Sequence, residues 1–92
     1  MIKYEQILEK IKGKMFIVAR KWNNEDWKIG NYKMKIGDIL RVVDWGMGMV
    51  DYIVVFENLR LQKRFQTAFW YFRACTEPLN WIESWEKIKN MG

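Results

Sequence analysis

The amino-acid sequence predicts a small α+β domain, namely an antiparallel β-barrel of about five strands flanked by one helix at each end. Residues 35–57 give the first signal, because two β-rich runs separated by a short glycine-containing turn are typical of a β-hairpin. Amphipathic segments at both ends of the chain give the second signal. A length of 92 residues is enough for one core. We therefore expect a single domain, with helices over residues 2–12 and 80–90 and the barrel over residues 14–79.

The first third of the chain is expected to hold a helix, a strand and a long loop. Gly13 is a natural stop for the helix, and apolar residues recur before it at the spacing of one buried helical face: Tyr4, Ile7, Leu8 and Ile11. Residues 14–22 are interpreted as a strand with a dense apolar centre. Residues 23–35 are polar and turn-prone, so we expect a loop there, with a short strand near residues 32–35 as an alternative.

The central hairpin is expected to turn at Gly46 and Gly48, between strands over residues 39–45 and 49–57. We interpret this turn as a plain connection. The alternative is that Met47 and Met49 present a flexible contact to a partner, because methionine side chains adapt to irregular surfaces.

The last third of the chain is expected to return to strands before a final helix. Residues 59–67 read as a strand, and the aromatic run that follows either extends it or makes one tight helical turn. Residues 73–77 are expected to form a short last strand. Asn80 and Glu83 match an amino-terminal capping box for the final helix. Trp81 and Trp85 on that helix are expected to pack against the barrel.

Catalytic residue types are scarce in this chain. It has no histidine, and Cys75 and Ser84 are its single cysteine and serine. This excludes Ser–His–Asp and Cys–His nucleophiles and zinc-finger ligand sets. Asp44 and Asp51 are candidates to face each other across the hairpin, but we interpret them as solvent-facing residues. We expect no enzymatic activity, no catalytic residues, no metal site and no cofactor.

The expected location is the cytoplasm. No apolar run approaches the roughly 20 residues that a membrane-spanning helix needs, so we expect no membrane partner. The amino terminus leads directly into an amphipathic pattern instead of a secretory signal. Cys75 has no intramolecular disulfide partner, which fits a reducing compartment, and we interpret it as a small buried hydrophobe.

Two short segments resemble the Src-homology-3-like (SH3-like) small barrel. Residues 35–43 place Lys-Ile-Gly-Asp before the strand Ile-Leu-Arg-Val-Val, as many such barrels do before their central hairpin. Residues 72–79, Phe-Arg-Ala-Cys-Thr-Glu-Pro-Leu, look like the short last strand and its exit. The resemblance covers residues 14–79 and implies a five-stranded fold shared by many binding modules. The terminal helices are additions to that fold, and the aromatic and acidic arrangement of a proline-peptide groove has no match here, so that activity is not carried over.

The charge pattern predicts recognition of RNA or single-stranded DNA. The net charge is +5, and the positive excess lies in the first 35 residues and after residue 59. Basic surfaces attract phosphate backbones, and nearby aromatic rings stack on unpaired bases. The expected phosphate-binding residues are Arg20, Lys21, Lys33, Arg60, Lys63 and Arg64, with Trp22, Trp27 and Tyr32 as the aromatic residues that contact the partner. The alternative for the charge is an ordinary solvated surface.

A second hypothesis is a protein-binding module or a small inhibitor, such as a virus-encoded one. It would use Trp27 and the neighbouring loops as anchors, because Trp and Tyr bury large areas at interfaces. A homodimer formed through the same aromatic surface is a milder form of this hypothesis.

Overall fold

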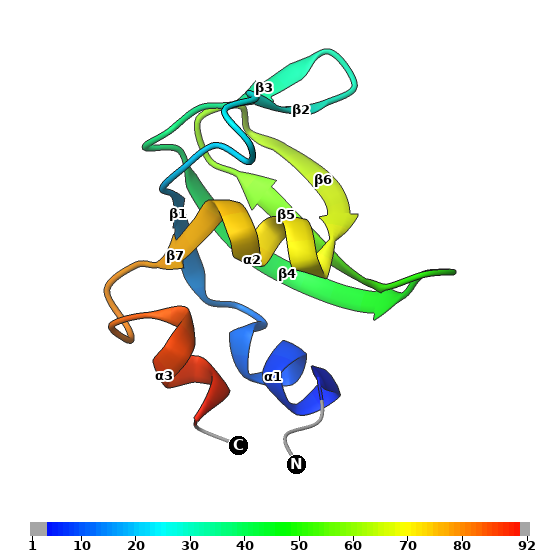
Figure 1. Ribbon diagram of the computed structural model, residues 1–92, viewed down its shortest axis with the longest axis vertical. Coiled ribbons are helices and arrows are strands. Elements are labelled where there is room, and N and C mark those ends of the chain that lie inside the picture. The colour runs from blue at the N-terminus through cyan, green and yellow to red at the C-terminus, as the bar shows by residue number, and fades with distance from the viewer. Residues whose placement is uncertain (1–3, 91–92) are drawn as a thin grey trace.

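The computed structural model describes residues 4–90, and within them the chain forms an α+β fold with a five-stranded sheet, a two-stranded sheet and three helices (Figure 1). The α+β class and the antiparallel sheet are as predicted. The elements in chain order are α1 (Tyr4–Ile11), β1 (Met15–Val18), β2 (Trp27–Ile29), β3 (Tyr32–Met34), β4 (Ile39–Met47), β5 (Tyr52–Asn58), β6 (Lys63–Ala68), α2 (Phe69–Cys75), β7 (Thr76–Pro78) and α3 (Trp85–Lys89).

The main sheet has the strand order β6-β5-β4-β1-β7, and every neighbouring pair is antiparallel. β1 therefore lies between the last strand and the β4–β5–β6 meander. Within the described residues no pairing joins the edge strands β6 and β7, so the prediction of a closed barrel is wrong. The physical reason is α2, which connects these two strands as a helix and packs its buried residues Phe69, Phe72 and Cys75 into the core.

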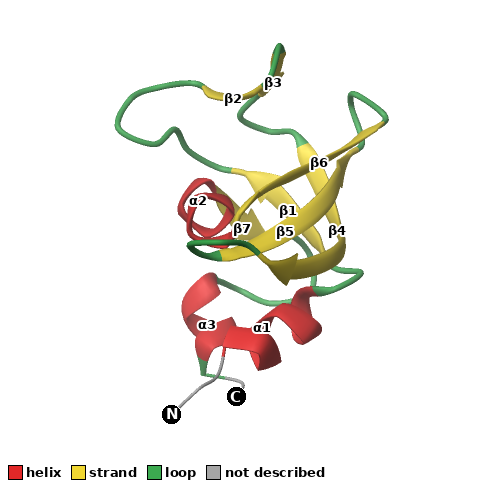
Figure 2. Cartoon of the chain, turned by 90° about the vertical axis from the view of Figure 1, so that its right-hand side faces the viewer, coloured by secondary structure: helices red, strands yellow, loops and turns green. Residues whose placement is uncertain are grey.

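Helices α1 and α3 lie side by side at one end of the sheet, and α2 covers another side (Figures 1 and 2). The predicted face of α1 is buried at Ile7, Leu8 and Ile11. Two hydrogen bonds fasten α1 to the hairpin: Trp45 Nε1 donates to Glu9 at 2.9 Å, and the Tyr52 hydroxyl donates to Glu5 at 3.0 Å.

Both tryptophans of the carboxyl-terminal segment pack on the sheet, as predicted. The Trp85 ring stacks on Phe16 with centroids 4.9 Å apart. Its indole N–H donates to the Thr76 carbonyl, and that of Trp81 donates to the Met15 carbonyl. The buried N–H group of Trp85 and the part-buried one of Trp81 are thus satisfied by backbone acceptors.

The final helix is shorter than predicted, and its cap is different. α3 begins at Trp85, and Ser84 Oγ accepts from the Lys87 N–H at 3.4 Å. Asn80 instead has a φ of 66°, in the left-handed region. A residue in that conformation belongs to a turn, so the predicted capping box from Asn80 to Glu83 is wrong. The first helix was predicted over residues 2–12, of which residues 2 and 3 lie outside the described part.

Several strands also begin or end at residues other than those predicted. The predicted strand 14–22 ends at Val18, residues 59–62 form a turn before β6, and residues 73–75 belong to α2, so that β7 begins at Thr76. The short strand near residues 32–35 is confirmed as β3, and it pairs with β2, which the sequence did not predict. This hairpin projects at the end of the sheet opposite α1 and α3 (Figure 1).

Candidate functional site

Arg60, one of the predicted phosphate-binding residues, is held by a nearly buried carboxylate. Asp38 is 6% exposed and accepts from Arg60 Nε at 2.7 Å and from an Arg60 terminal nitrogen at 3.0 Å. It also accepts from Asn58 Nδ2 and from the Lys35 backbone N–H. Burial acts to raise the pKa of Asp38, but these hydrogen bonds and the Arg60 charge outweigh it and hold the pKa below its usual value. Arg60 also donates to the Lys33 carbonyl at 2.8 Å, so it joins β3, the residues before β4 and the β5–β6 turn.

Three other predicted cations also have carboxylate partners. The ammonium groups of Lys21 and Lys33 lie 3.2 and 3.1 Å from the two oxygens of Asp26. Arg20 pairs with Glu77 and donates to the Ala74 carbonyl. Arg20, Lys21 and Lys33 do come together, since all three line a small pocket of about 220 Å³ beside Trp27.

Lys63 and Arg64 differ from the other four, because within residues 4–90 neither has a carboxylate partner. The Lys63 ammonium lies 5.3 Å from the centre of the Tyr32 ring, a cation–π contact. The structure therefore leaves two of the six predicted cations, at the start of β6, with their charge uncompensated by an ion pair.

The three predicted partner-contacting aromatics have different environments. Trp22 and Tyr32 are exposed, at 41% and 40%. Trp27 is 2% exposed and packs among the rings of Phe56, Tyr71 and Phe72. Trp27 therefore lacks the exposure that the predicted partner contact requires, because the β2–β3 hairpin turns this side chain into the core.

Among the described residues, the most exposed large apolar side chains lie at the tip of the β4–β5 hairpin, residues 47–51. Met49 and Val50 expose essentially their full surface, and Met47 exposes 72%. The turn is tight at Gly48, whose N–H donates to the Asp51 carbonyl, and a Cβ there would lie 2.6 Å from that oxygen. The Asp51 carboxylate accepts from the Trp70 N–H at 3.1 Å and so fastens the tip to the start of α2.

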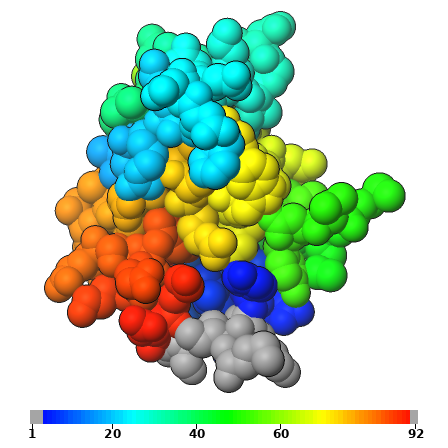
Figure 3. Space-filling view, viewed as in Figure 1, coloured from blue at the N-terminus to red at the C-terminus, as the bar shows by residue number. Residues whose placement is uncertain are grey.

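Beside the tip lies a groove of about 570 Å³, here called the tip groove, lined by residues 48–51 and 53, the end of β6, the start of α2 and Tyr4. Figure 3 shows the tip (green) projecting beside α2 (yellow) and α1 (blue). Trp70 forms part of the wall, is 45% exposed and lies edge-on to Trp22 at 5.5 Å. The groove therefore combines apolar side chains from the β4–β5 hairpin, β6, α2 and α1.

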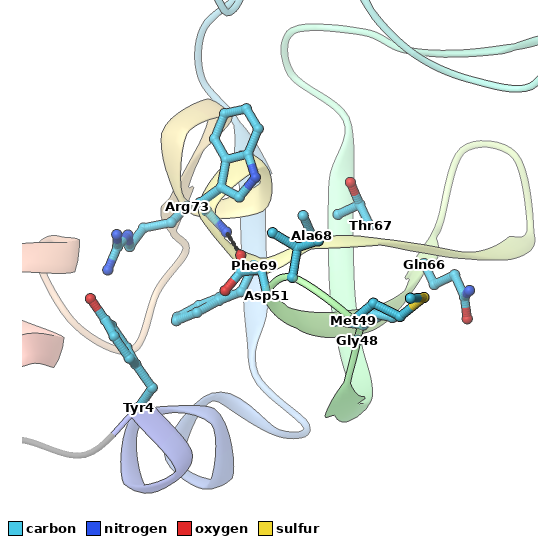
Figure 4. Close-up of a pocket in the computed structure, with 12 residues that line it drawn as sticks. Tyr4, Gly48, Met49, Asp51, Gln66, Thr67, Ala68, Phe69 and Arg73 are labelled. Atoms are coloured by element: carbon cyan, nitrogen blue, oxygen red, sulfur yellow. Dashed lines mark hydrogen bonds between the residues drawn. The ribbon is translucent and has the colours of Figure 1, made fainter.

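The tip groove also carries an uncompensated positive charge. The Arg73 guanidinium lies 5.3 Å from the Phe69 ring centre and 5.8 Å from that of Tyr4. Tyr4 and Arg73 point toward one another, and a dashed line marks the hydrogen bond of Asp51 (Figure 4). Arg73 has no carboxylate partner in the described part of the chain. Asp51, the one carboxylate among the described lining residues, is engaged with α2.

This site was largely missed from the sequence. Met47 and Met49 were considered as a contact, but the turn was interpreted as a plain connection. The available signal was an apolar Met-Gly-Met-Val run at a hairpin turn, where polar residues are usual. The contributions of Trp70 and Arg73 had no such signal, because they reach the groove only through the path of α2.

Asp44 and Asp51 of the hairpin do not form the pair considered from the sequence. Asp44 lies opposite Val55 in the β4–β5 ladder and Asp51 lies in the turn, so the predicted facing pair is wrong.

No three histidine, cysteine, aspartate or glutamate side chains within residues 4–90 are grouped to hold a metal ion. In that same range, each helix is too short or too polar to cross a membrane.

Comparisons with protein-family models, curated proteins and solved structures found no match to this chain.

Proposed function

We propose that this chain is a non-catalytic protein-binding module whose docking surface is the β4–β5 tip together with the tip groove. The observation that carries the proposal is the full exposure of Met49 and Val50 beside an apolar groove. Burying such a side chain contributes about 1.5–3 kcal/mol. Apolar patches of this kind on a small protein mark interaction sites.

The tip is held in place by the fold, which favours binding. The Gly48–Asp51 backbone hydrogen bond closes the turn, and the Asp51–Trp70 hydrogen bond joins it to α2. A surface ordered before association loses less conformational entropy when a partner binds. Met47 and Met49 keep flexible side chains on this fixed backbone, so the surface can adapt to its partner.

The test is capture of a protein partner on immobilised wild-type chain from nuclease-treated lysate, repeated with a Met49→Ser, Val50→Ser double variant. The expected result is a protein that survives nuclease and is lost with the double variant. A Lys87→Ser, Lys89→Ser variant of the exposed face of α3 is the control and should retain it. Equal capture by wild type and the tip variant would refute the proposal.

Membership of the SH3-like barrels is a further part of this proposal. It is supported by β1 lying between the last strand and a three-stranded meander. It is also supported by the Gly37-Asp38 turn ahead of β4, where Gly37 has a φ of 96°. The open sheet and the additional helices are differences from a closed SH3-like barrel.

A second candidate function is binding of RNA or single-stranded DNA at the start of β6. The supporting observations are that Lys63 and Arg64 lack carboxylate partners within residues 4–90 and that Lys63 lies over the exposed Tyr32 ring. An unstructured oligonucleotide should then bind with an affinity that falls steeply as salt rises. Salt-independent binding, or unchanged affinity after Lys63→Glu with Arg64→Glu, would contradict this candidate.

A further inference from the structure

We propose that the segment recognised by the tip groove is an extended strand that adds to the outer edge of β6 and brings an acidic side chain to Arg73. This inference rests on the proposed function, because it names the occupant of the same surface.

The first argument is the unpaired edge of β6. This strand pairs only with β5, and in the described residues its outer N–H and C=O groups have no backbone partner. Six residues of strand extend over about 20 Å. The opposite edge, β7, has three residues and ends in Pro78, which lacks an N–H. β6 is therefore the edge on which a partner strand has room to pair.

The second argument is continuity between this edge and the groove. Gln66, Thr67 and Ala68 at the end of β6 line the groove that Met49 and Val50 also line (Figure 4). A strand paired along β6 would therefore end beside the apolar groove. Main-chain hydrogen bonds would supply affinity, and contacts of alternate side chains with the tip would supply selectivity.

The third argument is charge. Lys63 and Arg64 begin β6 and Arg73 follows its end, and within residues 4–90 none of the three has a carboxylate partner. An acidic segment complements this surface. A second copy that paired through its own β6 would bring no carboxylate to these cations, because β6 (Lys63–Ala68) contains neither Asp nor Glu. The charges therefore favour an acidic partner segment over self-association.

The test begins with a display library of random twelve-residue peptides that is selected for binding to the full chain. Peptides that also bind the Met49→Ser, Val50→Ser variant are discarded, because their binding does not depend on the tip. Enriched peptides should contain Asp or Glu together with alternating apolar residues. One enriched peptide is then synthesised unmodified, with its acid replaced by lysine, and with N-methyl groups on either of the two alternating sets of residues. Dissociation constants are measured by fluorescence anisotropy.

Strand addition gives an asymmetric result, because only one alternating set of N–H groups faces β6. Methylation of that set should weaken binding about tenfold or more, as expected for two lost hydrogen bonds. Methylation of the other set should have little effect. The Arg73→Met variant, which keeps the apolar stem, should lose the preference for acid over lysine, whereas Lys87→Met on α3 should keep it.

Three outcomes would overturn the inference: no enriched peptide, equal effects of the two methylation patterns, or an unchanged acid preference in Arg73→Met. The methylation result needs no variant and stands even if Arg73→Met folds poorly. Failure of the proposed function looks different, because the tip double variant would then still capture the cellular partner. Loss of that capture with symmetric methylation effects would leave the docking surface intact and remove only strand addition.

Discussion

Replacing Asp38 with asparagine should destabilise the protein far more than replacing a carboxylate on the sheet surface. Asp38 is 6% exposed and accepts four hydrogen bonds, two of them from Arg60. In Asp38→Asn the charge is lost, and the new amide N–H₂ meets a neighbouring donor. The donors that bonded to the replaced carboxylate oxygen are then left without an acceptor.

The size of the effect follows from burial and bonding. A hydrogen bond to a charged group contributes about 1.5–3 kcal/mol, and breaking a buried ion pair costs about 3–5 kcal/mol. The Arg60 side chain is 38% exposed, so water replaces part of what it loses. We therefore expect a loss of about 2–4 kcal/mol in the free energy of unfolding. At a urea m-value near 1 kcal/mol/M, the unfolding midpoint should fall by about 2 M or more.

Urea unfolding followed by tryptophan fluorescence measures this loss. The matched control is Glu57→Gln, which removes an Arg41–Glu57 ion pair on adjacent strands of the sheet surface. Surface pairs contribute about 0–1 kcal/mol, so the control should change the midpoint little. Equal losses in the two variants would refute the claim that the Asp38 network clamps the turns at this end of the sheet.

The dependence on pH provides an independent check. The pKa of Asp38 is lower in the folded chain than in the unfolded chain. A depressed pKa contributes stability that is fully present above the unfolded pKa and is lost as the pH falls through the folded pKa. The difference between wild type and Asp38→Asn should therefore be constant near neutral pH and shrink below about pH 4. A difference that grew on acidification would contradict the assignment.

Three further predictions concern the core and the last helix. Trp27→Ala should lower the free energy of unfolding by about 3–5 kcal/mol, whereas the exposed Trp22→Ala should change it little, both measured by urea unfolding. Burial raises the pKa of the Cys75 thiol although Arg20 opposes the shift, so a thiol reagent at pH 8 should react slowly with the native chain and rapidly in urea; comparable rates would contradict a buried thiol. Ser84→Ala should cost about 0.5–1 kcal/mol through loss of the cap, and Ser84→Asp should retain the stability; equal stability of Ser84→Ala and wild type would show that the cap contributes nothing.

Much of the fold was predictable because its signals are local. The periodic apolar face of α1 and the glycine-containing hairpin each lie within a short window of sequence. The aromatic run after β6 was ambiguous because such residues favour strands. Phe69, Phe72 and Cys75 recur every three residues, and this spacing was the available signal for the helix that prevents the sheet from closing.

The candidate site was less predictable because its features depend on contacts between distant residues. Asp38 and Arg60 are 22 positions apart, and Arg20 and Glu77 are 57 apart. Counting charges therefore overestimated the available cations. Trp27 lies in a polar segment, and only the pairing of β2 with β3 turns it inward. No local pattern reports such pairings.

β4 links the rigid end of the molecule to the proposed docking surface. It begins next to the Asp38 clamp and ends at the exposed tip, and its register shifts by one residue between Val42 and Asp44. An extra residue of this kind increases the local twist and bends the strand, which re-aims the residues that follow. The residues before the shift, Leu40 and Val42, are buried, whereas those after Asp44 lead out to the tip. The first half of β4 thus packs in the core, and its second half carries the tip. The tip can therefore stay exposed without weakening the core.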